Sequence, residues 1–397
     1  MTELLEQSEA LKASISTNFK RYLFDEIDWS NRLIGIKGAR GTGKTTLLLQ
    51  RLKELALNAT HAAYFSLDDI YFLEHSLVGT IRQYHKEGGR FVFLDEVHKY
   101  PNWSREVKNL YDQIPDLSIV FTGSSIIDIS RQESDLSRRV LMHELPGLSY
   151  REFLALNGII NIPSITVSEL IDSKRDIREL FPGNFKPYEH FNNYLNYGYY
   201  PFYSEDIIGY KRRLRQMVRI IVEYDMAELK GFDIRNARKM LQLLQIIAQQ
   251  VPFKPNLVKL AEKSGIHRNT ILNYLHFLEE ARLIKLLYPS GNSIAKLQKP
   301  EKLYLDNTNL LISLSNENNS VGTVRETFFY NQLNIKHNVY EPKQGDFDID
   351  GQIIFEVGGR NKKQKQIKGL TKAFIVKDEL EYPIDNAIPL WLFGFTY

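Results

Sequence analysis

The chain of 397 residues contains no cysteine, which excludes disulfide bonds and any zinc or iron–sulfur centre held by thiolates. An excess of one charge is also lacking, because 51 Lys and Arg residues stand against 48 Asp and Glu, for a net charge of +3. Any basic surface for nucleic acid must therefore be local. No apolar run is long enough to span a bilayer, and the acidic N-terminal segment is unlike a signal peptide. We expect a cytoplasmic protein without membrane contact.

A complete phosphate-binding motif lies near the start of the chain. The segment GARGTGKT matches the pattern G-x-x-x-x-G-K-[ST], between a short apolar run and a stretch of helix formers. Its glycines let successive backbone N–H groups point at phosphate oxygens, at the positive end of the following helix. Lys44 is expected to reach the β- and γ-phosphates, and Thr45 to hold Mg²⁺. The predicted nucleotide contacts here are Gly38, Ala39, Arg40, Gly41, Thr42, Gly43, Lys44, Thr45 and Thr46.

A second motif supplies two acids. The apolar run Phe91–Leu94 is typical of a buried parallel strand, and it ends in Asp95 and Glu96. Ligands of open α/β sheets lie at the carboxyl ends of the strands, so both acids are expected to face the phosphates. Asp95 is placed to order the Mg²⁺ shell, and Glu96 to position and polarise the attacking water.

Further strands fit the same sheet. The run Leu117–Phe121 leads into Thr122, whose hydroxyl is our candidate for contact with the γ-phosphate or the water, with Ser124 as its rival. Residues His61–Ser66 form another candidate strand. Because strands alternate with helical patterns, we predict an α/β fold with a doubly wound parallel sheet.

The successive motifs GARGTGKTTLL, FLDEVHKYPNW, VFTGSS, DLSRRV and LPGLSYREF resemble those of the bacterial and archaeal AAA+ P-loop ATPases that carry an uncharacterised C-terminal region. This group is similar to the archaeal ATPase branch of the signal-transducing NTPases. The resemblance implies ATP and Mg²⁺ as ligands, with residues 1–147 as the ATPase core. It further implies that Lys44 and Thr45 contact phosphate and metal, that Asp95 and Glu96 are the metal and water acids, and that Thr122 is a sensor-like residue.

The same resemblance raises the question of an arginine finger that would reach a neighbouring subunit's γ-phosphate. Arg139 matches the arginine of the family's Leu-Ala-Gly-Arg segment, whereas Arg138 stands where glycine is usual. Which of the two acts as a finger is left open, and adjacent arginines are often solvated charge.

Residues 148–235 have a helical pattern that begins with a capping box, Ser149 followed by Glu152, and we predict a helical lid there. Within it, the segment around Gly198 and Pro201 resembles a Gly-x-x-Pro element of the family that lies against bound nucleotide. An aromatic-rich corner between helices is an equal alternative for these residues.

Residues 236–306 show a helix, a short turn with Gly265 and a second helix, followed by two short strand-like runs. This order is typical of a winged helix-turn-helix domain. If it reads DNA, the side chains nearest the groove are His267, Arg268, Asn269 and Asn273. An interdomain role is the alternative, since no dense Lys and Arg stripe is present.

Residues 307–397 resemble the PD-(D/E)xK nuclease core, in which carboxylates of adjoining strands bind Mg²⁺ and a lysine aids the water. By that resemblance Asp348 and Glu356 are the metal acids, with Glu326 from the preceding helix in support. The lysine position, however, is Gly358, and its replacement is left open between Arg360, Lys362 and Lys363. We prefer a degenerate nuclease fold that is used for binding.

Three functional hypotheses follow. The first is Mg²⁺-dependent ATP hydrolysis coupled to a conformational change of the C-terminal domains. The second is a slow ATP-gated switch in signalling or defence that binds a protein or DNA partner. The third is an ATP-controlled nuclease. The sequence leaves open the pathway, the protein partner and whether the chain forms a homo-oligomer.

Overall fold

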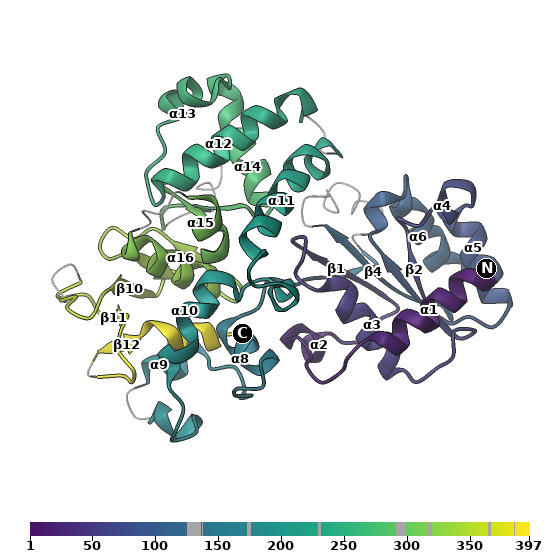
Figure 1. The fold of residues 1–397 in the computed structure, drawn as a ribbon, viewed down its shortest axis with the longest axis horizontal. Coiled ribbons are helices and arrows are strands. Elements are labelled where there is room, and N and C mark those ends of the chain that lie inside the picture. Colours follow the sequence, from purple (N-terminus) through teal and green to yellow (C-terminus); the bar gives the residue numbers. More distant parts are fainter. Residues whose placement is uncertain are drawn as a thin grey trace. The chain divides into compact units, whose positions relative to one another are not determined.

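The computed structural model describes residues 1–124, 136, 138–172, 176–228, 232–290, 299–315, 320–363, 367–384 and 386–397. The chain divides into two compact units, Met1–Gly147 and Leu148–Tyr397 (Figure 1). Within the described ranges, none of the helices has the length and apolar character that crossing a bilayer requires.

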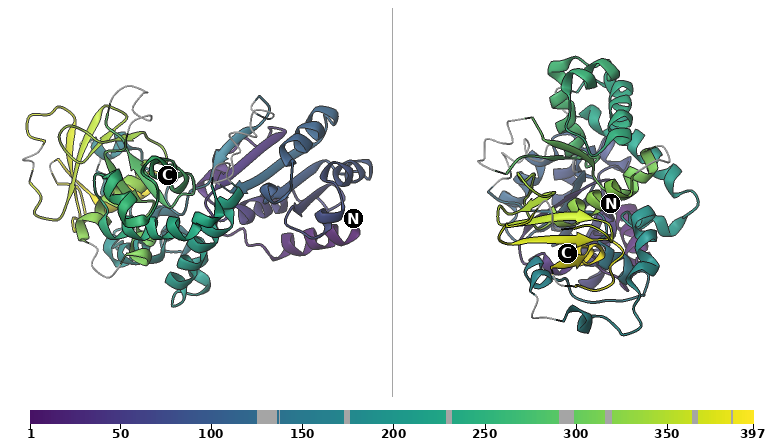
Figure 2. Two further views of the ribbon diagram at one scale, coloured as in Figure 1. Left: turned by 90° about the horizontal axis from the view of Figure 1, so that it is seen from above. Right: turned by 90° about the vertical axis from the view of Figure 1, so that its left-hand side faces the viewer.

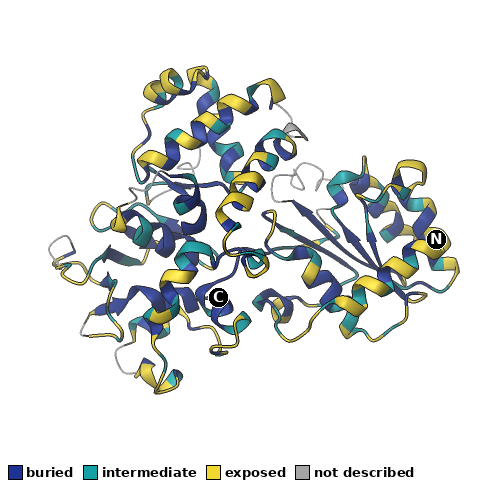
Figure 3. Cartoon of the chain, viewed as in Figure 1, coloured by how far each residue is buried: buried dark blue, intermediate teal, exposed yellow. Residues whose placement is uncertain are grey.

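The first unit is built on a parallel sheet with the strand order β2-β3-β4-β1-β5. Its strands are β1 (Leu33–Gly38), β2 (Ala62–Ser66), β3 (Phe91–Asp95), β4 (Ser118–Ser124) and β5 (Leu141–Glu144). The inner strands β3, β4 and β1 and the edge strand β2 are mostly buried (Figure 3). This topology, with crossover segments between parallel strands, confirms the predicted P-loop NTPase fold.

Helices cover both faces of this sheet (Figure 2). They are α1 (Thr2–Ser14), α2 (Tyr22–Glu26), α3 (Lys44–Glu54), α4 (Tyr71–Glu74), α5 (Leu77–Lys86), the 3₁₀ turn η1 (Val97–Lys99) and α6 (Trp103–Gln113). Alternate strand residues face opposite sides. Ile34 and Val120 pack with apolar residues of α2 and α3, whereas Leu33 and Phe121 pack with those of α4, α5 and α6. The sheet therefore separates two apolar layers.

Local sequence signals set several helix ends. Ser76 caps α5 by accepting a hydrogen bond from the backbone N–H of Gly79. Ser149 and Glu152 form the predicted capping box at the start of α8. Gly265 ends α13 with a φ of 65°, in the left-handed region that glycine adopts without steric cost. These helices thus begin and end where the side chains satisfy the terminal backbone groups.

The second unit begins with a series of helices. They are α8 (Tyr150–Leu156), α9 (Val167–Ile171), η2 (Ile177–Leu180), α10 (Pro187–Tyr197), η3 (Pro201–Glu205), α11 (Tyr210–Glu223), η4 (Asp225–Glu228), η5 (Ile234–Asn236), α12 (Ala237–Gln250), α13 (Leu257–Ser264) and α14 (Arg268–Glu280). An antiparallel hairpin of β6 (Ile284–Leu287) and β7 (Lys302–Leu305) follows. The two helices and the strand-like runs expected after residue 256 are therefore present.

The second unit ends in a mixed sheet with the strand order β12-β11-β10-β9-β8. Its elements are α15 (Thr308–Leu314), α16 (Val321–Leu333), β8 (Val339–Tyr340), β9 (Phe347–Ile349), β10 (Ile353–Gly358), β11 (Ala373–Lys377), β12 (Ala387–Pro389) and η7 (Leu390–Phe395). Strands β8, β9 and β10 pair antiparallel, and β10, β11 and β12 pair parallel. Phe329 of α16 packs against Phe347 and Phe355, with ring centroids 5.2 and 5.4 Å away, so α16 covers one face.

Buried polar contacts connect distant segments of the second unit. Asn309 of α15 is fully buried, and its amide group donates to the carbonyl oxygens of Tyr194 and Leu195. Its Oδ1 accepts from the backbone N–H of Tyr199 and the hydroxyl of Tyr210. Because all these hydrogen bonds are internal, replacing Asn309 would leave several buried groups without partners.

Candidate nucleotide site

The phosphate-binding loop lies at the carboxyl end of β1 and continues into the first turn of α3. Gly41 and Gly43 have φ values of 81° and 94°, in the left-handed region. Gly38 is needed for a different reason, since a Cβ atom there would lie 2.4 Å from the carbonyl oxygen of Leu145. The three glycines of the motif therefore each have a structural requirement.

Lys44 is held against the backbone of this loop. Its side chain is almost completely buried, and Nζ donates to the carbonyl oxygens of Gly38 and Ala39, each at 3.0 Å. Thr42 Oγ1 donates to the same Ala39 oxygen at 2.9 Å. Arg40 and Thr46 are exposed on either side. The loop thus carries one fixed positive charge on its inner side.

Asp95 is the centre of a buried hydrogen-bond network. Its Oδ2 accepts from Thr45 Oγ1 at 2.6 Å and from the Tyr64 hydroxyl at 2.8 Å, and its Oδ1 accepts from Thr122 Oγ1. Burial and the charge of Asp95 raise the pKa of Tyr64 well above its usual range, so Tyr64 remains a donor. The network fixes the Asp95 carboxylate next to the first turn of α3.

Glu96 follows Asp95 in an unusual backbone conformation, with a φ of 52°. Its backbone N–H donates to Thr122 Oγ1 at 3.1 Å, and its Oε2 lies 3.2 Å from Nε2 of His98. Burial raises the pKa of Glu96, and the positive charge of Lys44 opposes this shift. Thr122 therefore contacts both acids, while the Glu96 carboxylate is itself partly exposed.

The donor set of this site suits Mg²⁺. A buried carboxylate and a threonine hydroxyl, 2.6 Å apart in the pair Asp95 and Thr45, present hard oxygen ligands next to a phosphate-binding loop. Both side chains are oriented by the surrounding hydrogen bonds, as is typical of residues that hold a metal. The residues present thus fit a magnesium nucleotide.

Arg139 is not brought together with these residues. It lies just before β5, at the amino ends of the parallel strands, whereas Lys44 and Asp95 lie at the carboxyl ends. Its Nε is 2.7 Å from Asp112 Oδ1, in an ion pair at the end of α6. Arg139 is consequently distant from the nucleotide site of its own chain. Ser124, the rival of Thr122, ends β4. Ser125, which follows it, and Ser137, which precedes Arg138, lie outside the described residues.

Gly198 and Pro201 belong to the second unit. Gly198 ends α10, where a Cβ atom would meet the ring of Tyr194 at 2.6 Å, and Pro201 begins η3. Tyr200 between them is buried, and its hydroxyl accepts a hydrogen bond from Asn307 at 3.1 Å. These contacts form a tightly packed aromatic corner.

The candidate DNA contacts lie at the N-terminal end of α14. His267, Arg268, Asn269 and Asn273 are all exposed. His267 also caps the helix by accepting from the backbone N–H of Asn269. Arg268 lines a small pocket of about 420 Å³ with Lys254 and Lys299. Three cationic side chains therefore gather at this helix end.

The three carboxylates of the predicted second metal site are not gathered in one place. Asp348 lies opposite Ile354 in the register of β9 and β10, so Asp348 and Glu356 are diagonal neighbours on one face of the sheet. Glu326 lies on α16, which covers the other face, and accepts from the Tyr304 hydroxyl at 2.7 Å. Among the described residues, no group of three or more potential ligands is positioned to hold a metal.

Among the three candidates for the missing lysine, Lys362 contacts Glu356. Its Nζ lies 3.0 Å from Glu356 Oε1, and Glu356 is almost fully buried. A Cβ atom on Gly358 would lie only 2.6 Å from Cγ and Cδ of Lys362. The Lys362 stem thus occupies the space that a side chain at position 358 would need.

Comparison with known families finds two segments of the chain that match family models. Residues 30–154 match the family model described as an AAA domain. This segment is therefore similar to AAA domains. Residues 188–321 match a domain of unknown function, DUF8612. An uncharacterized protein of Methanocaldococcus jannaschii is 28% identical over 386 residues, covering 88% of this chain and 81% of that protein.

Two solved structures show distant similarity. AMPPCP-bound DnaA from Aquifex aeolicus is 14% identical, with a TM-score of 0.27, and the match covers 68% of this chain and 86% of that chain. The Hsp104–ADP complex of S. cerevisiae is 15% identical, with a TM-score of 0.32 and coverage of 70% and 41%.

Three residues of the first unit that contact this site were not singled out by the motifs. Tyr64 comes from the neighbouring strand β2, and His98 follows the acids after one residue. Arg21 is buried and donates to the carbonyl oxygens of Thr42, Pro146 and Gly147 at 2.7 to 2.9 Å. His98 had a sequence signal, since it lies two positions after Glu96. Tyr64 and Arg21 had none, because tertiary structure brings them to the site.

Proposed function

We propose that the AAA domain binds ATP with Mg²⁺ and hydrolyses it, and that this cycle rearranges the second unit. The observation that carries the proposal is the hydrogen-bond chain from Thr45 through Asp95 and Thr122 to Glu96. It links the helix after the phosphate-binding loop to both acids. A loop that merely binds an anion does not require such a chain.

Each residue has a distinct role in this proposal. Lys44 and the loop N–H groups hold the phosphates, while Thr45 and Asp95 hold Mg²⁺, which supplies charge neutralisation on the phosphate oxygens. Glu96 orients the attacking water and withdraws its proton. Thr122 fixes the relative position of the acids. Arg139 would contact ATP only from a neighbouring copy of the chain. In its own chain it pairs with Asp112 at the amino ends of the strands, whereas the phosphate-binding loop lies at their carboxyl ends.

The second unit is the proposed partner-binding part. The order of α13, α14 and the hairpin β6–β7 supports a winged-helix arrangement. Arg268 and Lys299 support DNA as its ligand, whereas Lys254 beside them is paired with Glu301 at 2.5 Å. Cleavage of nucleic acid is less favoured, because Glu326 is separated from Asp348 and Glu356 by the sheet.

The test is phosphate release from Mg-ATP by the purified chain and by its Glu96→Gln variant, with and without DNA. We expect the variant to bind ATP and to lose turnover by about 10²- to 10⁴-fold, since general-base assistance contributes that much. Lys44→Ala is expected to lose nucleotide binding. Glu74→Gln, an exposed carboxylate at the end of α4, is the matched control and should hydrolyse ATP normally.

Two outcomes would change the proposal. Undiminished hydrolysis by Glu96→Gln would refute the assigned role of this acid. Tight ATP binding with negligible turnover in the unaltered chain would instead support the slow switch, in which a partner supplies what hydrolysis lacks.

A further inference from the structure

Arg21 contacts the phosphate-binding loop although it belongs to the segment that precedes the sheet. Its side chain is buried, with an exposed fraction of 4% for the residue. Nη1 donates to the carbonyl oxygen of Thr42 in the loop at 2.7 Å, and Nη2 donates to those of Pro146 and Gly147 at 2.8 and 2.9 Å. One guanidinium group therefore joins the phosphate-binding loop to the last two residues of the first unit.

The backbone around Arg21 is held in place by other contacts. The side-chain amide of Gln50 in α3 donates to the carbonyl oxygens of Ser16 and Phe19, which fixes the segment before Arg21. Phe24, in the helix α2 that follows, is buried among apolar residues of β1 and α3. The side chain of Arg21 thus extends from a fixed point, and its guanidinium group is the part that can respond to the loop.

The two units join at the peptide bond between Gly147 and Leu148, and hydrogen bonds fix the residues on each side. Gly147 is held by Arg21. The backbone N–H of Leu148 donates to the carbonyl oxygen of Tyr199 at 2.7 Å, and the carbonyl oxygen of Leu148 accepts from the Tyr194 hydroxyl at 2.8 Å. A displacement of Gly147 is therefore passed on to Leu148, because no flexible linker absorbs it.

Phosphate binding acts on the same part of the loop. Nζ of Lys44 donates to the carbonyl oxygen of Ala39 at 3.0 Å, so a phosphate that attracts Lys44 competes with this hydrogen bond. Thr42 Oγ1 donates to the same Ala39 oxygen at 2.9 Å, so a change at Ala39 reaches Thr42. Because a guanidinium group is planar and its donors form a rigid fork, a shift of the Thr42 carbonyl turns both terminal nitrogens of Arg21 together.

We propose that Arg21 is a positioning residue that transmits the state of the phosphate-binding loop to the junction with the second unit. Thr42 moves the guanidinium group, which displaces Gly147 and, through the peptide bond, Leu148. Arg21 has this role only if ATP binding rearranges the second unit, as proposed above. Replacing Arg21 then separates the binding of ATP from the rearrangement.

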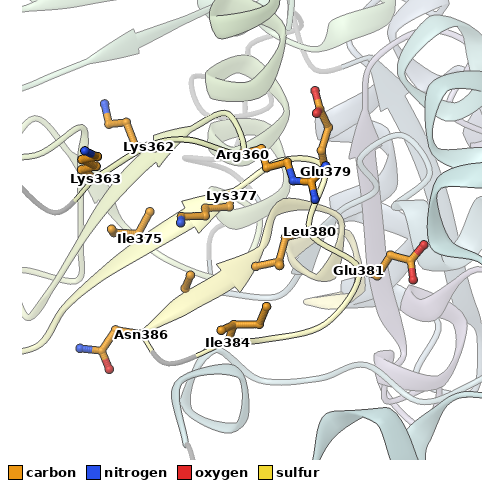
Figure 4. A pocket seen from close by; sticks show the side chains of 11 residues that line it. Arg360, Lys362, Lys363, Ile375, Lys377, Glu379, Leu380, Glu381, Ile384 and Asn386 are labelled. Carbon is orange, nitrogen blue, oxygen red and sulfur yellow. The ribbon is translucent and has the colours of Figure 1, made fainter.

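The experiment measures energy transfer between two dyes on the full chain, which has no cysteine of its own to compete for the label. One dye is attached through Lys86→Cys at the exposed end of α5. The other is attached through Asn386→Cys, an exposed position just before β12 in the second unit (Figure 4). Energy transfer is recorded with and without the non-hydrolysable analogue AMPPNP and Mg²⁺, and binding of the analogue is measured separately by titration calorimetry.

Arg21→Lys is the variant under test, since an ammonium group keeps the charge but lacks the fork that bridges Thr42 and Gly147. Arg32→Lys is the matched control, because Arg32 also donates to three backbone carbonyl oxygens but lies just before β1, at the amino ends of the strands. Its acceptors are Tyr111, Ile114 and Pro115. A third variant inserts two glycines between Gly147 and Leu148, which keeps Arg21 but adds a flexible link to the junction.

We expect Arg21→Lys to bind the analogue within about tenfold of the unaltered chain, since Lys44 and the Thr42 hydroxyl still hold the loop. The analogue should change energy transfer in the unaltered chain and equally in Arg32→Lys. In Arg21→Lys and in the insertion variant this change should fall to less than about one fifth, because the coupling between the loop and the second unit is lost while binding is kept.

A full change of energy transfer in Arg21→Lys would overturn the role of Arg21 and leave the proposed function standing. An equal loss in Arg32→Lys would also overturn it, since the effect would then be one of general stability. Should Arg21→Lys fail to fold by circular dichroism, a full response of the insertion variant would overturn the route through Gly147.

Failure of the proposed function gives a different result. Binding of the analogue without any change of energy transfer in the unaltered chain would refute the rearrangement, and a lack of binding would refute the nucleotide site. Either result would remove the role of Arg21 as well.

Discussion

Nε2 of His98 lies 3.2 Å from Oε2 of Glu96, and the His98 side chain is only 2% exposed. Burial and the nearby charges of Lys99, Lys44 and Arg40 lower the pKa of His98 to about 3. The ring is therefore neutral at ordinary pH, so its contact with Glu96 is not an ion pair between two charged groups. His98 thus packs against Glu96 without adding positive charge.

This pair predicts a pH dependence of stability. Since the pKa of His98 is lower in the folded chain than its usual value of 6.5, the unfolded state binds the extra proton. Stability is full above pH 6.5 and falls by about 1.4 kcal/mol per pH unit as the pH drops towards 3. His98→Gln should remove this part of the slope in urea unfolding of the nucleotide-free chain. The exposed His75→Gln is the control, and an unchanged slope in His98→Gln would contradict the argument.

The residues that form the candidate nucleotide site could be selected from the sequence because their signals are local. The loop GARGTGKT and the acids after Phe91–Leu94 each occupy one continuous segment, and buried apolar runs indicated the strands. The rest depends on contacts between distant segments. Arg21 meets Pro146 across 125 positions, and Tyr64 meets Asp95 because β2 lies beside β3. No periodicity specifies such pairs.

The C-terminal sheet shows the same limit. Its strand positions were predictable. The residue that replaces the missing lysine could not be chosen among Arg360, Lys362 and Lys363, because the chain turns after β10. Only the tertiary structure brings Lys362 next to Glu356 and Gly358. Likewise, sequence spacing could not reveal that Glu326 and Glu356 belong to opposite faces of the sheet.

Thr122 tests the connection between the two acids. Thr122→Val keeps the shape of the side chain but leaves Asp95 Oδ1 and the backbone N–H of Glu96 without this partner. We expect turnover or the apparent affinity for Mg²⁺ to fall by about 10- to 100-fold, as for other residues that orient metal ligands. Titrating Mg²⁺ against the ATPase rate measures this effect.

Two control variants show whether the effect of Thr122→Val comes from the loss of its hydrogen bonds to Asp95 and Glu96. Tyr64→Phe should have a smaller effect, since Thr45 still donates to the same Asp95 oxygen. Thr80→Val controls for loss of a buried hydroxyl, since Thr80 of α5 is buried and its hydroxyl donates to the carbonyl oxygen of Ser76, the N-cap of the same helix. A Thr122→Val chain with the Mg²⁺ dependence of the Thr80 variant would argue against the network.

The winged-helix arrangement predicts an effect on DNA binding. Arg268→Ala combined with Asn269→Ala should weaken binding to duplex DNA several-fold at moderate salt, because both side chains are exposed at the start of α14. Binding is measured by anisotropy, with Arg212→Ala/Asn193→Ala as a matched exposed pair. If the unaltered chain shows no salt-dependent binding to duplex DNA at all, α14 has a structural role instead.

The ion pair between Lys362 and Glu356 predicts a coupling that a double-mutant cycle measures. Lys362→Met removes the cation but leaves the Glu356 carboxylate buried without this partner, and we expect a loss of about 1–3 kcal/mol of unfolding free energy. Adding Glu356→Gln removes the buried charge as well, so the double variant should recover part of this loss.

Gly358→Ala provides an independent check on the same geometry. Its new Cβ atom would meet the Lys362 stem at 2.6 Å, so the lysine must move away from Glu356 unless the backbone shifts. Gly358→Ala should therefore lower the unfolding free energy of the otherwise unaltered chain. It should lower it less when combined with Lys362→Met, because the colliding side chain is then uncharged, flexible and has no ion pair to maintain. Strictly additive free energies in both cycles would mean that Lys362 and Glu356 do not interact in solution, and that Gly358 is not what lets the lysine approach.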